Sequence, residues 1–571
     1  MLASLRQTAP CVPAGQELRG QRRFLARCRV ATAQPSQGRR QRGGGDDPHG
    51  WDREQWAAGY VSLAEEALDY EVVDIEGVVP AELSGTYFRN GPATFEAGTE
   101  LFAHPFDGDG LMTALELHGG RAHLRSRFVD TPERRAEKAA GRILYRNTFG
   151  TQRRGGAAAN ALDVGQKNVS NTNVLFWAGR LWSLWEALQP YRLDARTLET
   201  LGIDTLDGTL HEGLPFGTGL GPVDELLRAA RTGLGGDAFS AHPHVEGATG
   251  KLVTFSYAIR LALPPVGPLQ TVITLLEFEP GSVVPSSRRE IPLQGYGFCH
   301  DFCFTDTHAI FFQSPVDLDL VPFVTGQRCP GECLRFDATR PTLAFVVPRH
   351  DAAAPVRVYQ LPPAFVFHHA NAAAATDGSG DIIVDSVHLE GLALGMSPDG
   401  DFRDVDFEGV YPYRLFRTRL PTAPGGKEAS TAQVSPRIVE FPSVAPSRFG
   451  RPARYVYCAC VTHPTRVQPL QSWLKLDMDD AAGLARGDVA STVWHPGRHC
   501  FVGEPQFVAA ASPRSEDDGY LMGWIFDGER KVAAFAILDA RSMTQVAMLR
   551  LKHAVPYGLH GTWVPSLTDD A

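Results

Sequence analysis

The sequence predicts an all-β fold, and the spacing of four of its histidines is compatible with a seven-bladed β-propeller. Glycine (57) and proline (41) recur throughout the 571 residues, and short apolar segments between such turn-forming residues are typical of strands. Intervals of 58, 68 and 192 residues separate His242, His300, His368 and His560, and 192 is three intervals of 64. Units of roughly 60 to 70 residues fit seven times into residues 83–566. Radial repetition of four-stranded sheets hides their edges and brings one strand of each to a common axis.

The composition divides the chain into three parts. Residues 1–45 hold nine arginines, no lysine and one acidic residue, Glu17, which is typical of an organelle transit peptide and linker. The segment is poor in serine, so mitochondrial targeting remains an alternative to plastid targeting. A tail without any targeting function is a further alternative. Residues 46–82 are expected to pack on the propeller as a short helix and an extended segment. Residues 83–566 are expected to form the propeller.

Strand-like segments follow one another with turns between them to the end of the chain. Residues 305–308 are interpreted as the turn of a hairpin, and residues 107–110 as another, because the acidic spacing of a calcium loop is absent there. Residues 222–232 are the best helix candidate, and a surface helix is favoured over one that caps a cavity or touches a membrane. The clearest strand candidates are residues 252–257, 271–278, 382–387, 453–460 and 531–538.

Charge, cysteines and missing motifs exclude several classes of function. A net charge of -10 without a basic face argues against a nucleic-acid partner. Nine cysteines do not close a disulfide framework, so reduced buried thiols are expected. The sequence contains no apolar run of about 18 residues that would span a membrane. It also lacks a nucleophile elbow, a phosphate loop and a dinucleotide fingerprint.

Four short stretches place a histidine beside Gly, Pro or Asn and next to a strand-like segment. One such histidine is usually structural, but four of them suggest a shared site, because neutral imidazole is the commonest protein ligand for transition metals. Four imidazoles leave the charge of a divalent ion uncompensated, so carboxylates that accept the other ring N–H are expected nearby. Glu186, Glu440 and Glu504 are flanked by apolar residues in the sequence and fit this role. The stretches are AHPH at 241–244, GYGFCHDFCF at 295–304, FHHANA at 367–372 and YGLHGTW at 557–563.

Eight motifs in a fixed order resemble the carotenoid cleavage dioxygenase family, which includes stilbene-cleaving oxygenases and the retinoid isomerase of the eye. The resemblance spans about residues 87–564, and each motif alone is weak. The motifs are FRNGP at 88–92, HPFDGDG at 104–110, NTNV at 171–174, AHP at 241–243, HDF at 300–302, FHHANA at 367–372, GEP at 503–505 and HGTW at 560–563.

The resemblance implies a seven-bladed propeller with a dome of loops and helices over its metal-bearing face. It implies one Fe(II), bound by His242, His300, His368 and His560, with His244 and His369 as neighbours of ligands. Glu186, Glu440 and Glu504 would hold His300, His368 and His560 respectively, and His242 would lack such a partner. Two coordination positions would remain, one of them for O2, and Thr172 would restrict access to the other.

The implied activity is oxidative cleavage of a conjugated double bond in a carotenoid or apocarotenoid to two carbonyl products. A stilbene-cleaving or isomerase-like member with the same iron centre is the nearest alternative, and a propeller that binds a polyene without turnover is an alternative of another class. Because polyenes are insoluble in water, transient contact with a membrane or lipid droplet is expected. The bond that is cut and the oligomeric state do not follow from the sequence.

Overall fold

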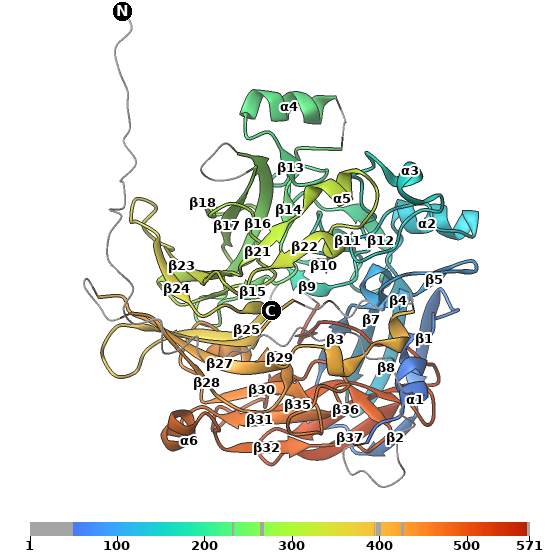
Figure 1. Cartoon of the computed structure of the whole chain (residues 1–571). Helices are drawn as coiled ribbons and strands as arrows, with labels where there is room; N and C mark the ends of the chain where they lie inside the picture. Colours follow the sequence, from blue (N-terminus) through green and yellow to red (C-terminus); the bar gives the residue numbers. More distant parts are fainter. Residues whose placement is uncertain are drawn as a thin grey trace, which may run out of the picture. The chain divides into compact units, whose positions relative to one another are not determined.

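Seven β-sheets of four to six strands form the blades of a propeller (Figure 1). The computed structural model describes residues 50–230, 233–262, 268–392, 394, 401–423 and 428–567. The expected transit peptide and linker at 1–45 lie outside these residues. The all-β, seven-bladed fold predicted from the sequence is confirmed.

Five blades are built from consecutive stretches of the chain. Blade 2 contains β9 (Asn173–Trp177), β10 (Arg180–Leu184), β11 (Tyr191–Leu193) and β12 (Thr200–Ile203). Blade 3 contains β13 (Phe216–Gly217), β14 (Ala238–Phe239), β15 (His244–Val245), β16 (Leu252–Leu261), β17 (Leu269–Phe278) and β18 (Ser287–Pro292). Blade 4 contains β19 (Cys303–Phe304), β20 (His308–Gln313), β23 (Thr342–Pro348) and β24 (Arg357–Leu361). Blade 5 contains β25 (Phe365–Ala374), β26 (Ile382–Leu389), β27 (Tyr413–Leu420) and β28 (Ser430–Gln433). Blade 6 contains β29 (Val439–Ser443), β30 (Tyr455–Cys460), β31 (Ser472–Asp477) and β32 (Ser491–Trp494).

The two remaining blades join distant parts of the chain and close the ring. In blade 1 the C-terminal strand pairs with β3, and in blade 7 an N-terminal strand pairs with β37. The described part of the segment 46–82, residues 50–82, therefore contributes outer strands to two blades, in addition to a short helix. Blade 1 contains β1 (Ala67–Val72), β3 (Gly85–Arg89), β4 (Pro92–Thr94), β7 (Asp109–His118), β8 (Arg121–Phe128) and β38 (Gly561–Val564). Blade 7 contains β2 (Asp74–Gly77), β33 (Cys500–Val502), β34 (Gln506–Ala509), β35 (Gly519–Asp527), β36 (Val532–Asp539) and β37 (Thr544–Arg550).

The hydrophobic core lies mainly between neighbouring blades. One cluster joins Phe255 and Ile273 of blade 3 to Phe302 and Phe311 of blade 4. Another joins blade 1 to blade 7 through Leu115 and Phe535, so the ring is closed by side-chain packing as well as by strand pairing. The seven cysteines of the described residues are free thiols, and five of them are buried.

Helices are short and lie outside the sheets. The described residues hold α-helices of five to nine residues, and none of these is long and apolar enough to span a bilayer. They are α1 (Arg53–Ala57), α2 (Pro132–Ala140), α3 (Gly156–Asn160), α4 (Gly221–Ala229), α5 (Leu320–Val324) and α6 (Ala481–Arg486). The 3-10 helices are η3 (Ala58–Tyr60), η4 (Pro105–Asp107), η5 (Gly331–Cys333), η6 (Phe402–Asp404), η7 (Phe407–Gly409) and η8 (Pro446–Arg448). Two small hairpins, β5 (Glu96–Ala97) with β6 (Glu100–Leu101) and β21 (Val316–Leu318) with β22 (Leu334–Phe336), complete the fold.

The local predictions were accurate except at one turn. The hairpin at 305–308 is confirmed, because Cys303 pairs with Ile310 across it. The helix predicted at 222–232 is α4, which ends at Ala229, and residues 231–232 lie outside the described part of the chain. The prediction of a hairpin turn at 107–110 is wrong: Asp107 ends η4 and Asp109 begins β7. Both carboxylates are buried, and Asp107 accepts hydrogen bonds from the backbone of a neighbouring loop.

Candidate metal centre

Four histidine side chains from four blades meet at one point. One nitrogen from each of His242, His300, His368 and His560 lies within 4.8 Å of the others. The Nε2 atoms of His242 and His300 are 2.9 Å apart. Among the described residues, no other His, Cys, Asp or Glu side chains gather in such a cluster. His244 and His369, the neighbouring histidines, are not part of it.

Each histidine stands at an end or an irregularity of a strand. His242 lies between β14 and β15, His300 precedes β19, and His560 precedes β38. His368 is inside β25, where the register with β26 shifts on both sides of His369. Such bulges re-aim a side chain, which lets His368 leave the alternation of the strand.

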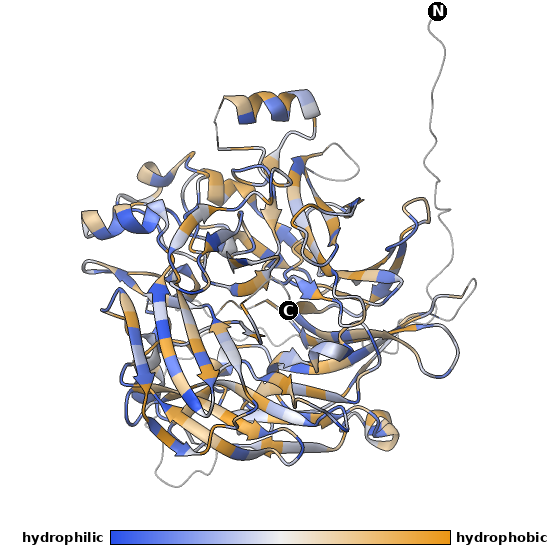
Figure 2. Cartoon of the chain, turned by 180° about the vertical axis from the view of Figure 1, so that it is seen from behind, coloured by the Kyte–Doolittle hydropathy of each residue, from blue (hydrophilic) through white to orange (hydrophobic). Residues whose placement is uncertain are grey.

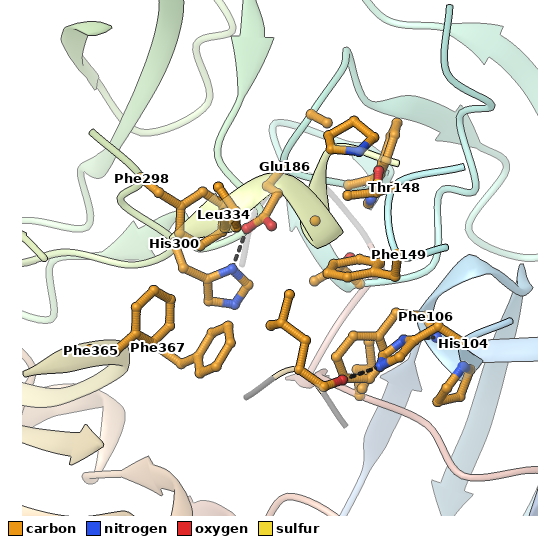
Figure 3. Close-up of a pocket in the computed structure, with 18 of the residues that line it drawn as sticks. His104, Phe106, Thr148, Phe149, Glu186, Phe298, His300, Leu334, Phe365 and Phe367 are labelled. Carbon is orange, nitrogen blue, oxygen red and sulfur yellow. Dashed lines mark hydrogen bonds and ion pairs between the residues drawn. The ribbon is translucent and has the colours of Figure 1, made fainter. Parts of the chain in front are cut away.

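Three of the histidines are oriented by glutamates. Nδ1 of His300 donates to Glu186 (Figure 3). Nδ1 of His368 donates to Glu440 at 2.6 Å, and Nδ1 of His560 donates to Glu504 at 2.9 Å. For His242 no hydrogen bond to a carboxylate is present in the described part of the chain. These are the three pairs of glutamate and histidine that the family resemblance implied.

These hydrogen bonds fix the tautomer of each ring. A neutral imidazole that donates through Nδ1 carries a lone pair on Nε2, and this atom can bind a metal. Nε2 of His368 is buried and has no hydrogen-bond partner. A buried polar atom without a partner is costly unless a ligand satisfies it. The all-nitrogen donor set with carboxylates behind it fits a divalent transition metal.

Burial and charge shift the pKa values of two of the histidines in opposite directions. Burial lowers the pKa of His242 well below its usual range, and the other histidines lower it further. Burial also lowers the pKa of His368, but the charge and hydrogen bond of Glu440 outweigh this and raise it to about 9. Burial raises the pKa of Glu440, but His368 outweighs this and lowers it. Without a metal, the charge of Glu440 therefore favours a proton on His368, whereas burial and the other histidines keep His242 neutral.

Asp301 is a buried carboxylate beside the cluster to which the sequence analysis gave no role. Its side chain accepts hydrogen bonds from His244, Phe302 and His369. Burial alone would raise its pKa, but the hydrogen bond and charge of His244 lower it to about 2. Asp301 is the second residue of the HDF motif at 300–302. A linear motif does not show that three distant segments donate hydrogen bonds to its carboxylate.

Thr172 lies next to the cluster. Its carbonyl accepts a hydrogen bond from the backbone N–H of His560, and its hydroxyl donates to the side chain of Asn171. The side chain also lines the cavity described next. Thr172 therefore contacts the segment that carries one of the four histidines.

A cavity of about 430 Å³ opens over the cluster and is lined by His300, His368 and His560. Figure 3 shows Phe298, Phe365 and Phe367 around His300, with Phe106 and Phe149 on the opposite side. Among the described residues that line the cavity there is no lysine, arginine or aspartate. The walls come from the loops that cover this end of the propeller, including η4, η5, η6 and η7. The cavity is suited to a large apolar molecule.

His104 is an uncharged histidine in the wall of this cavity. Burial lowers its pKa to about 4. Its Nδ1 accepts a hydrogen bond from the backbone N–H of Phe106, so Nε2 carries the hydrogen that is donated to the carbonyl of Leu394. Both ring nitrogens are therefore occupied, and His104 is a structural part of the wall.

The sequence is similar to known oxygenases over most of its length. The profile of the retinal pigment epithelial membrane protein family matches residues 60–565. The apocarotenoid-15,15'-oxygenase of Synechocystis sp. is 37% identical, over 89% of this chain and 96% of its own. The probable carotenoid cleavage dioxygenase 4, chloroplastic, of Arabidopsis thaliana is 26% identical, over 86% of this chain and 77% of its own. The lignostilbene-alpha,beta-dioxygenase isozyme III of Sphingomonas paucimobilis is 26% identical, over 86% and 93%.

The structure is similar to a solved oxygenase as well. The cobalt-substituted apocarotenoid oxygenase of Synechocystis superposes with a TM-score of 0.78 at 36% sequence identity. The match covers 90% of this chain and 99% of the other.

Proposed function

The chain belongs to the family of retinal pigment epithelial membrane protein and the carotenoid oxygenases, and we propose that it is an Fe(II)-dependent dioxygenase that cleaves a carotenoid or apocarotenoid. One conjugated double bond and one O2 would be converted to two carbonyl groups, each with one oxygen atom from O2. The observation that carries this proposal is the convergence of four imidazoles under an apolar cavity.

His242, His300, His368 and His560 would hold the iron. When bound, Fe(II) supplies the one-electron chemistry with O2 that a closed-shell ion such as zinc lacks. The cobalt-substituted relative supports a transition metal in this fold. Glu186, Glu440 and Glu504 hold three of the rings in the tautomer that a metal requires.

The remaining residues position the substrate and exclude water. The aromatic walls of the cavity would hold an extended polyene over the histidines, and no acid or base is needed to move a proton. Thr172 would restrict access to one side of the metal. The stronger similarity to the apocarotenoid-15,15'-oxygenase, at 37% against 26% for the other two relatives, favours an apocarotenoid as substrate.

The experiment is a product analysis with labelled oxygen. Purified protein, with Fe(II) and after its removal by a chelator, is incubated under ¹⁸O2 with carotenoids, apocarotenoids and stilbenes. We expect two carbonyl products from a polyene, each with one ¹⁸O, only when Fe(II) is present. Cleavage of stilbenes alone would support the alternative that the lignostilbene relative represents. Full iron occupancy without any product would support a binding protein.

We further propose that α4 contacts a lipid surface from which the substrate enters. Leu220 and Leu226 are 62% and 67% exposed, Leu261 is 64% exposed, and α4 stands away from the sheets (Figures 1 and 2). The preceding segment reaches the cavity through Phe216. Leu226→Glu should reduce co-sedimentation with phospholipid vesicles. Val73→Glu, at a similarly exposed apolar residue between β1 and β2, should not.

The proposed address is a plastid, with a mitochondrion or the cytoplasm as alternatives. The support is the arginine-rich, acid-poor composition of residues 1–45. A fluorescent protein fused after residue 45 would be imported into plastids, and a fusion to residues 46–571 alone would not. Import into mitochondria would reject the plastid address.

A further inference from the structure

Asp301 connects three of the four histidine-bearing segments through one carboxylate. Its Oδ1 accepts a hydrogen bond from Nε2 of His244 at 3.0 Å and from the backbone N–H of Phe302 at 2.7 Å. Its Oδ2 accepts from the backbone N–H of His369 at 2.8 Å. The side chain is 3% exposed, so these bonds are shielded from water.

The three segments belong to three consecutive blades. His244 is in β15 of blade 3, Phe302 directly precedes β19 of blade 4, and His369 is in β25 of blade 5. In sequence, the carboxylate is 57 residues from His244 and 68 from His369. One side chain therefore crosses two blade boundaries at the point where the histidine cluster is assembled.

His242 is the histidine that most needs such a connection. The other three have a glutamate on Nδ1, and His242 has none within the described residues. Only Pro243 separates His242 from His244, and the proline ring fixes one of the few backbone torsions between them. The ring of His244 is further held by stacking on Phe449, with centroids 4.1 Å apart. Fixing His244 therefore restricts the position of His242.

We propose that Asp301 is a positioning residue for the metal centre, acting on His242 through His244 in place of the missing glutamate. Asp301 also positions His368, through the hydrogen bond that it accepts from the backbone N–H of His369. This inference rests on the proposed function only in that the four histidines bind a divalent metal.

The alternative is a carboxylate that stabilises the fold without affecting the metal. Asp385 provides the comparison, because it is a buried carboxylate of β26 in blade 5 that pairs with Arg417 through two hydrogen bonds of 2.8 Å. Within the described residues its carboxylate accepts hydrogen bonds from Arg417 and from no histidine-bearing segment. Loss of either carboxylate should lower the melting temperature, but only loss of Asp301 should alter the metal.

The test uses Co(II) as a spectroscopic probe on the full chain. Each oxygen of Asp301 accepts a hydrogen bond from a backbone N–H group, that of Phe302 or that of His369. In Asp301→Asn the amide NH2 replaces one oxygen, so in either orientation it faces an N–H donor. His244→Phe keeps an aromatic ring for stacking on Phe449 and removes the donor. Co(II) affinity and the visible absorption of the bound ion are measured for wild type, both single variants, the double variant and Asp385→Asn.

We expect Asp301→Asn to weaken Co(II) binding roughly 10- to 100-fold and to change the visible spectrum. His244→Phe should have the smaller effect, because Asp301 then keeps its backbone partners. The double variant should bind no more weakly than Asp301→Asn, because the two residues act along one route. Asp385→Asn should bind Co(II) like the wild type.

Several results would overturn the inference. Wild-type affinity and spectrum in folded Asp301→Asn would reject it, as would additive losses in the double variant or an equal loss in Asp385→Asn. If Asp301→Asn does not fold, unchanged Co(II) binding in His244→Phe rejects the route through His244, and weakened binding supports it. Failure of the wild type itself to bind Co(II) would instead reject the proposed metal centre.

Discussion

Glu440 holds His368 with a single oxygen atom. Its Oε2 accepts hydrogen bonds from Nδ1 of His368 at 2.6 Å and from the backbone N–H of Phe441 at 2.5 Å. Glu504 uses both oxygens: Oε1 accepts from Nδ1 of His560, and Oε2 from the backbone N–H of Gly561, each at 2.9 Å. The two glutamates therefore respond differently to replacement by an amide.

Glutamine at position 504 should weaken the metal site more than glutamine at position 440. In Glu440→Gln the amide oxygen can accept both hydrogen bonds, so only the charge is lost. In Glu504→Gln the amide NH2 must face a donor, so orientation is lost too. We expect Fe(II) affinity to fall roughly 100-fold in Glu504→Gln and about 10-fold in Glu440→Gln, measured by competition with a chelator. Equal losses in the two variants would show that charge alone matters.

Phe441 should limit the size of the substrate. Its ring lines the main cavity and also a second cavity of about 230 Å³ behind it. Its backbone has a φ of 50°, an uncommon conformation for a bulky residue, which indicates that its position is imposed by the surrounding structure. Phe441→Ala should join the two cavities and raise kcat/KM for polyenes with bulkier end groups relative to smaller ones. Phe416→Ala, outside both cavities, should leave this ratio unchanged, and the prediction fails if Phe441→Ala does so as well.

The sequence indicated the number of blades but not how the ring closes. Short apolar segments between turn-forming residues predicted the strands, because turn chemistry is local, and the histidine spacing was compatible with seven units. It did not reveal that β2 pairs with β37, where Glu76 faces Met548. Strand pairing over such a distance depends on the packing of the whole ring, so residues 46–82 were expected beside the propeller.

The candidate metal centre could likewise be predicted from the sequence only where its residues belong to recognisable motifs. The histidines and glutamates were selected because their motifs stand out in the sequence, and the structure brings all seven side chains together. Asp301 was adjacent to one of them and received no role. Its importance lies in partners far away in the sequence, which a linear motif does not contain.

Arg349 should be essential for stability and unimportant for the metal. Its buried guanidinium bonds Glu277 at 2.8 Å and Glu246 at 2.6 Å, and it joins blade 4 to blade 3. Arg349→Met would leave two buried carboxylates without their cation, which costs about 3 to 5 kcal/mol in free energy of unfolding. Denaturant unfolding measures this loss.

Arg419→Met supplies the matched control for Arg349. Arg419 pairs with Asp377 and Asp381 where water has access, so its loss should cost about 0 to 1 kcal/mol. Both variants should retain wild-type Fe(II) affinity when folded. A loss for Arg349→Met no larger than for Arg419→Met would contradict the assignment of a buried ionic connection between blades.

Asp107 should make the protein less stable as the pH rises from about 4 to about 6. Burial raises the pKa of this carboxyl to about 6, whereas an aspartate in the unfolded chain has a pKa of about 3.9. The folded state therefore binds the proton more tightly, and the free energy of unfolding falls as the pH rises through this interval. Asp107 accepts hydrogen bonds from the backbone N–H groups of Phe149 and Thr151, so the loss concerns a loop in the cavity wall.

Asparagine at position 107 removes this titration. The melting temperature of the wild type relative to Asp107→Asn should decrease from pH 4 to pH 6 and stay constant above about pH 7. Asp194 is a control of opposite sign, because a hydrogen bond from the backbone N–H of Thr197 lowers its pKa. The wild type should therefore gain stability over Asp194→Asn as the pH rises through the range of an ordinary aspartate. A pH-independent difference between the wild type and Asp107→Asn would mean that folding does not shift the pKa of this carboxyl.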